Sequence, residues 1–144
     1  MTTRASIVPD RARLCAEPFR LFFPVGVLLG WVGVGHWLLY GIGATGSYSC
    51  FRHGLLQTQA FLMAFALGFL WTALPRRIAA PLAGPVEIGL GLAALLVTAA
   101  ALVADAWVLA QLGYVALFAL LLAFAARRYA AGTVRRRPPA AFVL

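Results

Sequence analysis

Four apolar runs of about twenty residues each constrain this chain more than any other feature of its sequence. They cover residues 21–40, 54–74, 86–104 and 107–126. Twenty helical residues rise roughly 30 Å, which is the thickness of the hydrocarbon core of a bilayer. Only 11% of the residues are charged, against roughly 25% in soluble domains. The sequence therefore predicts an all-α integral membrane protein with four transmembrane helices.

The twelve basic residues, all of them arginines, predict the orientation of these helices. Eleven flank alternate runs on one side of the predicted bundle, and Arg52 alone falls on the other side. Cytoplasmic segments are enriched in Lys and Arg, so both termini are predicted to be cytoplasmic, with loops 41–52 and 105–106 outside. The scattered placement also argues against nucleic acid as a partner for the net charge of +8.

Three segments follow from this topology. Residues 1–17 are predicted to form a cytoplasmic N-terminal arm, residues 18–126 the four-helix transmembrane domain, and residues 127–144 an arginine-rich cytoplasmic tail. The last residues, 140–144, begin a new apolar run that is too short to span a bilayer. Two interpretations stay open, a frayed tail or a longer protein cut before its fifth span, and the abrupt break favours the second.

His36 and His53 are the two histidines, and the topology places both at similar depth near the outer face. Neutral imidazole is a good ligand for haem iron and for copper, so both are candidate metal ligands. The alternative is that each imidazole faces water or makes an ordinary hydrogen bond near the interface. Gln57 lies one turn after His53 on the same helical face and is a candidate hydrogen-bonding neighbour of a metal ligand. Gln59 faces elsewhere, and the sequence names no partner for it.

Small residues predict where the first two helices touch. They recur at intervals of three or four along each run: Gly26, Gly30, Gly33, Ala60, Ala64 and Gly68. Such residues let membrane helices approach closely, and glutamine can hydrogen-bond across the contact. These positions therefore predict a helix-packing face, with a slot for a flat cofactor as the alternative.

The acidic residues do not suggest a proton relay. Glu87 and Asp105 are the only acids after residue 17, and both fall near helix ends, whereas a relay needs acids at mid-membrane. Glu87 is expected to pair with Arg76 or Arg77. Glycine-rich phosphate loops, nucleophile elbows and HExxH motifs are missing from the sequence. This favours a protein without enzymatic activity and leaves that question open.

Two stretches, "EPFRLFFPVGVLLGW" at 17–31 and "HGLLQTQAFLMAFALGFLWTALPRR" at 53–77, resemble the NnrS family. In that family an FRPFF-like pattern opens the first span, and the second span opens with histidine and closes on GFLxTAxP. Residues 19–23 resemble the first pattern, and residues 68–75 match the second. Many members read His-x-His-Glu-Met at the start of the second span. This chain has only the first histidine of that run, His53.

The resemblance implies a multi-pass protein of the bacterial inner membrane that holds haem, here haem b, and copper, and acts in the response to nitric oxide and nitrosative stress. It makes His53 the first metal-ligand candidate and His36 the second. NnrS proteins are also much longer, which agrees with a cut before a fifth span. A different class stays open: a non-catalytic helical bundle that acts as a packing or partner-binding subunit. The partners expected are the lipid bilayer and either a second copy or another membrane subunit.

Overall fold

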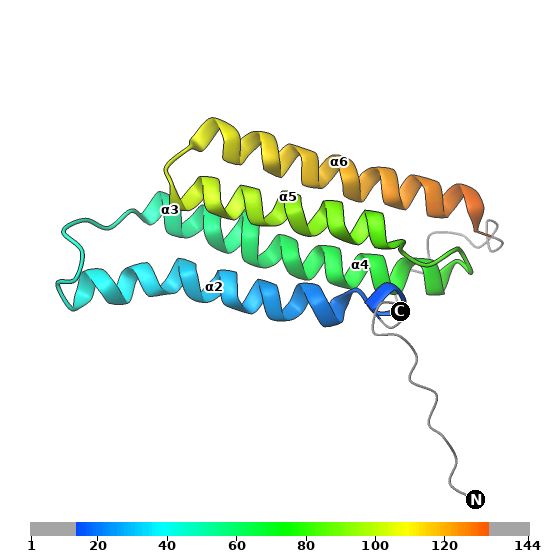
Figure 1. The fold of residues 1–144 in the computed structure, drawn as a ribbon, viewed down its shortest axis with the longest axis horizontal. Coiled ribbons are helices and arrows are strands. Elements are labelled where there is room, and N and C mark those ends of the chain that lie inside the picture. The colour runs from blue at the N-terminus through cyan, green and yellow to red at the C-terminus, as the bar shows by residue number, and fades with distance from the viewer. Residues whose placement is uncertain (1–13, 133–144) are drawn as a thin grey trace, which may run out of the picture.

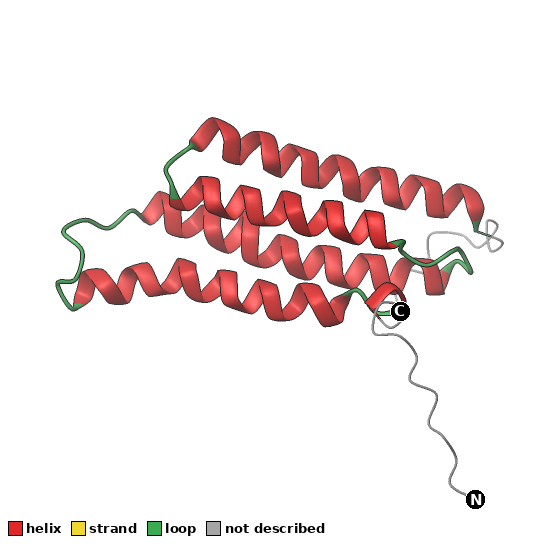
Figure 2. Cartoon of the chain, in the orientation of Figure 1, coloured by secondary structure: helices red, strands yellow, loops and turns green. Residues whose placement is uncertain are grey.

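A computed structural model describes residues 14–132, and the four predicted membrane spans are long apolar helices in it (Figure 1). The regular structure of these residues is entirely helical (Figure 2), which confirms the all-α prediction. The second span is one continuous helix, Cys50–Arg77, that contains a π-helical segment. In chain order the elements are α2 (Phe19–Gly41), α3 (Cys50–Leu55), η1 (Leu56–Leu62), α4 (Met63–Arg77), α5 (Pro85–Val103) and α6 (Trp107–Ala131).

The second span begins earlier than the sequence predicts, at Cys50 instead of residue 54. Ser49 supplies the cap: its Oγ accepts a hydrogen bond of 3.1 Å from the N–H of Arg52. Serine is preferred at this position because its side chain satisfies one of the free N–H groups at a helix start. The loop predicted at 41–52 therefore shortens to residues 42–49.

Other helix ends also differ from the prediction. Pro75 does not end the second span, which continues to Arg77. A proline removes a single N–H donor, and the N–H of Ile78 still bonds the carbonyl of Leu74 at 3.2 Å. α6 continues to Ala131, so the arginines at 127 and 128 lie on a helix and not in a tail. The predictions for residues 1–13 and 133–144, including the cut before a fifth span, lie outside the described residues.

The four spans lie side by side along the long axis of the molecule (Figure 1). α2 packs on the second span, α5 packs on α6, and η1 contacts both α2 and α5. One end of the bundle holds loop 42–49 and turn 104–106, and we call it the histidine end because His36 and His53 lie near it. The opposite end, the arginine end, holds the start of α2, loop 78–84 and the end of α6.

The described arginines separate between these two ends. Arg52 lies at the histidine end, where it forms an ion pair with Asp105. The others lie at the arginine end: Arg20, Arg76, Arg77, Arg127 and Arg128. This segregation is the pattern from which the orientation of a membrane protein is predicted.

Buried apolar side chains fill the bundle in two clusters. The larger surrounds Trp71, whose ring meets Phe22 edge-on with centroids 5.5 Å apart and lies 5.2 Å from the ring of Phe124. The smaller joins η1 to α5 and α6 through residues such as Leu56 and Leu102. Large apolar side chains also cover the outer faces of α2 and α6. Exposed apolar surface of this extent suits contact with lipid.

Candidate functional site

His53 lies in α3 and its ring faces α2. Its Nδ1 is 3.0 Å from the carbonyl oxygen of Gly33. A carbonyl oxygen can only accept, so Nδ1 carries the proton in this bond, and Nε2 of the neutral ring keeps a free lone pair. Histidines that bind metals commonly donate their other ring N–H to a backbone carbonyl in this way. The bond therefore favours the tautomer in which Nε2 is free to bind a metal.

Gln57 follows one turn later and makes an equivalent contact with α2. Its Nε2 donates a hydrogen bond of 3.0 Å to the carbonyl of Gly30. The amide thus reaches across the helix contact, as the sequence suggested for a glutamine at this position. The side chain bonds α2 rather than the ring of His53, so it holds the surface on which His53 rests.

The contact between α2 and the second span is close because its glycines have no side chain. A Cβ built at Gly33 would lie 2.6 Å from Gln57 Nε2, and one built at Gly26 would lie 2.9 Å from Ala64 Cβ. At Gly30 the neighbour is the ring of Phe61, at 2.9 Å. Side chains of the second span therefore fill the space beside Gly26 and Gly33. Beside Gly30 an apolar groove of about 250 Å³ remains, which Gln57 and Phe61 also line.

Ala60 is placed differently from the other small residues singled out in the sequence. It is fully buried in the smaller core cluster, together with Ala99 and Leu102 of α5. Gly68 lies on the α2 side, where a Cβ would be 3.0 Å from Phe22 Cβ. The small residues of the second span thus serve two helix contacts, because this span lies between α2 and α5.

His36 lies at the same end of the bundle but has different neighbours. Its ring stacks on that of Tyr48, with centroids 5.4 Å apart, whereas His53 lies against Trp37 at 6.4 Å. Burial raises the pKa of the Tyr48 phenol, and the adjacent Cys50 raises it further. Within residues 14–132, no hydrogen bond or ring contact joins the two histidines.

A groove of about 340 Å³ opens beside His36 at the histidine end. Its wall is largely apolar, with Leu39 of α2 and Leu56 of η1 among its residues, and Arg52 completes it. Arg52 is held by two hydrogen bonds to the carboxylate of Asp105, of which Nε to Oδ1 is 3.1 Å. The groove therefore presents one imidazole and one guanidinium.

The partner of Gln59 is Gln111 of α6, which the sequence analysis missed. Gln59 Nε2 lies 3.0 Å from Gln111 Oε1, and Gln111 Nε2 lies 3.2 Å from Gln59 Oε1. The available signal was Gln111 itself, because it is the one amide side chain in the apolar run 107–126. A membrane helix seldom carries such a group without a partner.

Glu87 pairs with Arg127 and Arg128 of α6, which corrects the predicted pairing with Arg76 or Arg77. The carboxylate is 3.3 Å from the nearer guanidinium nitrogen of Arg127. The reason is the packing of α5 on α6. The two helices run in opposite directions, so the start of α5 lies beside the end of α6 (Figure 1).

Comparison with known protein families gives a match over nearly the whole chain. The family model described as NnrS protein matches residues 13–144. The chain belongs to the NnrS family. This confirms the family that the resemblance indicated. No curated protein and no solved structure matches the chain.

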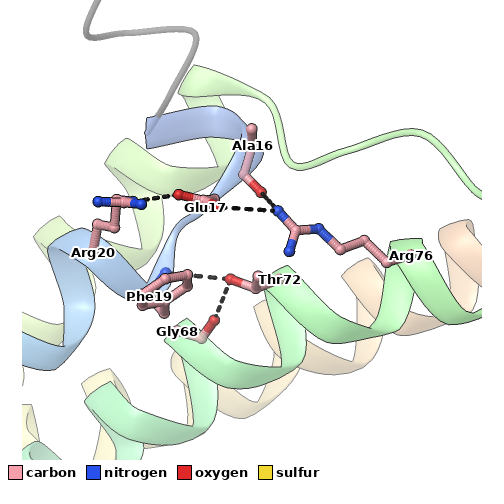
Figure 3. Close-up of polar contacts among 7 residues, drawn as sticks. All are labelled: Ala16, Glu17, Phe19, Arg20, Gly68, Thr72 and Arg76. Atoms are coloured by element: carbon pink, nitrogen blue, oxygen red, sulfur yellow. Dashed lines mark hydrogen bonds and ion pairs between the residues drawn. The ribbon is translucent and has the colours of Figure 1, made fainter.

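The two stretches that carry the NnrS resemblance contact each other at the arginine end (Figure 3). The N–H of Phe19 donates to Thr72 Oγ1 at 3.2 Å, and that hydroxyl donates to the carbonyl of Gly68 at 2.7 Å. Phe22 and Phe23 pack on Gly68. In this NnrS protein the two patterns, far apart in sequence, therefore build one helix contact.

Haem and copper are the groups that the NnrS resemblance implies, and His53 fits the role of one ligand to either. Its anchored Nδ1–H and free Nε2 are the features that such a ligand needs. Within residues 14–132, no three His, Cys, Asp or Glu side chains gather closely enough to hold a metal ion. In the described part of the chain, His53 and His36 therefore stand apart as single candidate ligands.

Proposed function

We propose that this NnrS protein supplies His53 as a ligand to haem b or copper at the histidine end, and that it acts in the response to nitric oxide. The supporting observation is the 3.0 Å hydrogen bond between His53 Nδ1 and the Gly33 carbonyl. It selects the tautomer with a free Nε2 and limits rotation of the ring, so less freedom is lost on binding. Haem or copper, when bound, supplies the redox centre.

The chain's other residues at this end position the imidazole. Gln57 fastens α2 to the second span one turn below His53, and Trp37 packs on the ring. His36 stands as the second ligand candidate, because it lines the groove that also exposes Arg52. Arg52 is paired with Asp105, and its remaining N–H groups would donate to an anionic group of the cofactor.

A spectrum of the purified protein tests this function. The full chain is isolated in detergent from cells supplied with haem and copper, and its visible absorption and metal content are measured. We expect a Soret band or bound copper, lost in His53→Ala. His53→Asn should also lose the Soret band or the copper, although its amide N–H can still donate to the Gly33 carbonyl. An unchanged melting temperature of the Asn variant would show that the loss is not unfolding. A wild-type protein with neither band nor metal would contradict the proposal.

The proposed orientation has both termini in the cytoplasm of a bacterium and the histidine end outside the inner membrane. It is supported by the segregation of the arginines between the two ends. The two native cysteines allow a direct test. Cys50 is exposed at the histidine end, and Cys15 lies near the arginine end. An impermeant thiol reagent should label Cys50 in intact spheroplasts and Cys15 only after lysis; the reverse result would invert the topology.

A packing or partner-binding subunit without a cofactor is the second candidate. It is favoured by the observation that His53 and Gln57 both bond carbonyls of α2, since packing alone accounts for these two side chains. It predicts that Gly30→Leu and Ala64→Leu disrupt assembly while His53→Ala and His36→Ala change little. The opposite pattern would support metal ligation.

A further inference from the structure

A groove of about 420 Å³ lies at the arginine end, between the start of α2 and the end of α4. Its apolar wall is formed by the rings of Phe19, Phe23 and Phe69 and by the small side chain of Ala73. Phe69 is 59% exposed. On a helix that spans a membrane, a ring exposed in this way faces lipid. The groove is therefore open to the bilayer along its side.

Contacts within the protein hold this groove in shape before any ligand binds. The bond from Phe19 N–H to Thr72 Oγ1 fixes the first turn of α2 against α4 (Figure 3). The ring of Phe23 stacks on Phe65 with centroids 4.5 Å apart and an interplanar angle of 22°. When a ligand binds to a site that is already formed, the protein loses less conformational freedom.

Two arginines line this groove, whereas the groove at the histidine end has one, Arg52, which is paired with Asp105. Arg76 and Arg77 line it at the arginine end. Arg76 donates to the carbonyl of Ala16 at 3.0 Å and lies 3.5 Å from Glu17, a carboxylate that it shares with Arg20 (Figure 3). Within residues 14–132, Arg77 has no ion-pair partner. Arg20 and Arg76 thus share one carboxylate and Arg77 adds a further guanidinium, so the excess charge is positive.

We propose that this groove binds one anionic phospholipid. The phosphate lies between Arg77 and Arg76, and an acyl chain lies along the rings of Phe19, Phe23 and Phe69. Arginine suits a phosphate because its planar group donates two parallel hydrogen bonds. Basic pockets between membrane helices are known to hold anionic head groups. The apolar wall should make the affinity for a lipid higher than that for free phosphate. The excess positive charge should make the affinity for an anionic lipid higher than that for a zwitterionic one.

The proposal does not depend on the cofactor proposal, and lipid binding to the purified full chain tests it. The protein in detergent is titrated with phosphatidylglycerol or phosphatidylcholine of equal chain length, and native mass spectrometry counts the bound lipid. We expect a clear preference for phosphatidylglycerol. Arg77→Gln should weaken its binding about fivefold, the effect of one basic group near an anionic head group.

Two matched variants separate a site from general attraction. Arg127→Gln removes an exposed arginine at the same end but outside the groove, and it should leave phosphatidylglycerol binding unchanged. Ala73→Phe fills the wall while keeping both arginines, and it should weaken both lipids. Equal losses for Arg77→Gln and Arg127→Gln would overturn the proposal. So would equal binding of the two lipids, no effect of Ala73→Phe, or displacement of the lipid by inorganic phosphate alone. Circular dichroism melting curves verify that each variant is folded.

Discussion

Gln59 and Gln111 face each other across the contact between the second span and α6 and exchange two amide hydrogen bonds. Gln59 is only 6% exposed, whereas Gln111 is exposed at the edge of this contact. No water is available in the core of a bilayer, so each amide depends on the other to satisfy its hydrogen-bonding groups. The pair therefore fixes the rotation of α6 against the second span.

Gln111→Leu is expected to lower the free energy of unfolding by about 0.5–2 kcal/mol, because it leaves the Gln59 amide buried without its partner. Replacing both residues by leucine should cost less than the sum of the two single changes, since no amide is then stranded. Denaturant unfolding in detergent, followed by circular dichroism, measures all four proteins. Strictly additive effects would mean that the two amides do not stabilise each other.

Gly33→Ala should destabilise the contact between α2 and the second span. The new Cβ would lie 2.6 Å from Gln57 Nε2 and 3.2 Å from Leu56 Cβ. The Gln57 side chain can shift, but it would then lose its hydrogen bond to the Gly30 carbonyl, which costs about 1 kcal/mol. Gly35→Ala is the control, because a Cβ there meets no atom within 4 Å and alanine favours the helix. The melting temperatures of both variants test this prediction. Equal destabilisation would show that the close approach of the two helices at Gly33 is not the cause.

Arg128 and Arg127 should differ in their contribution to stability although they are neighbours. Arg128 is 9% exposed, pairs with Glu87 and donates to the carbonyl of Leu82 at 3.0 Å. Arg128→Gln leaves the carboxylate without its buried partner and is expected to cost about 3 kcal/mol. The side chain of Arg127 is 61% exposed, so Arg127→Gln should cost at most about 1 kcal/mol. Similar losses of unfolding free energy in the two variants would contradict this assignment.

Glu17 should titrate at a lower pH than an ordinary glutamate. The hydrogen bond from Arg20 lowers its pKa, desolvation opposes this in part, and the charges of Arg20 and Arg76 lower it further. A lowered pKa means that the contact is complete above the ordinary pKa of a glutamate and is lost as the pH falls through the lowered value. Carbon NMR of the Glu17 carboxyl measures the midpoint. Arg20→Gln should raise it, and a wild-type midpoint at the ordinary value would refute the expectation.

The number and place of the four spans could be predicted because the thickness of a bilayer fixes the length of an apolar helix. The contact face of α2 could be predicted as well, since glycines three and four apart lie on one side of a helix. The ends of the helices could be predicted less well. The capping bond of Ser49 and the closing of the last turn beyond Pro75 depend on local hydrogen bonds, which hydropathy does not report.

The long-range polar pairs could not be predicted, because they depend on which helices become neighbours. Gln59 and Gln111 are 52 residues apart, and Glu87 meets Arg128 only because α6 returns along α5. The position of His53 near the first residues of the second span could be predicted from the sequence, but the direction of its ring could not. That direction follows from the rotation of the second span, and η1 alters the number of residues per turn within it.

The two polar side chains that α2 receives at the histidine end, those of His53 and Gln57, both bond to main-chain carbonyls. A helical carbonyl has a second lone pair, and every turn of α2 presents one. The two bonds could therefore form again if α2 slid lengthwise by a turn. Such a slide, by four residues, would bring Leu29 or Trp37 to the place of Gly33. A Cβ there already lies 2.6 Å from Gln57 Nε2 and 3.2 Å from Leu56 Cβ, so these large side chains lack room. The hydrogen bonds hold the helices together at many alignments, and the glycines select one of them.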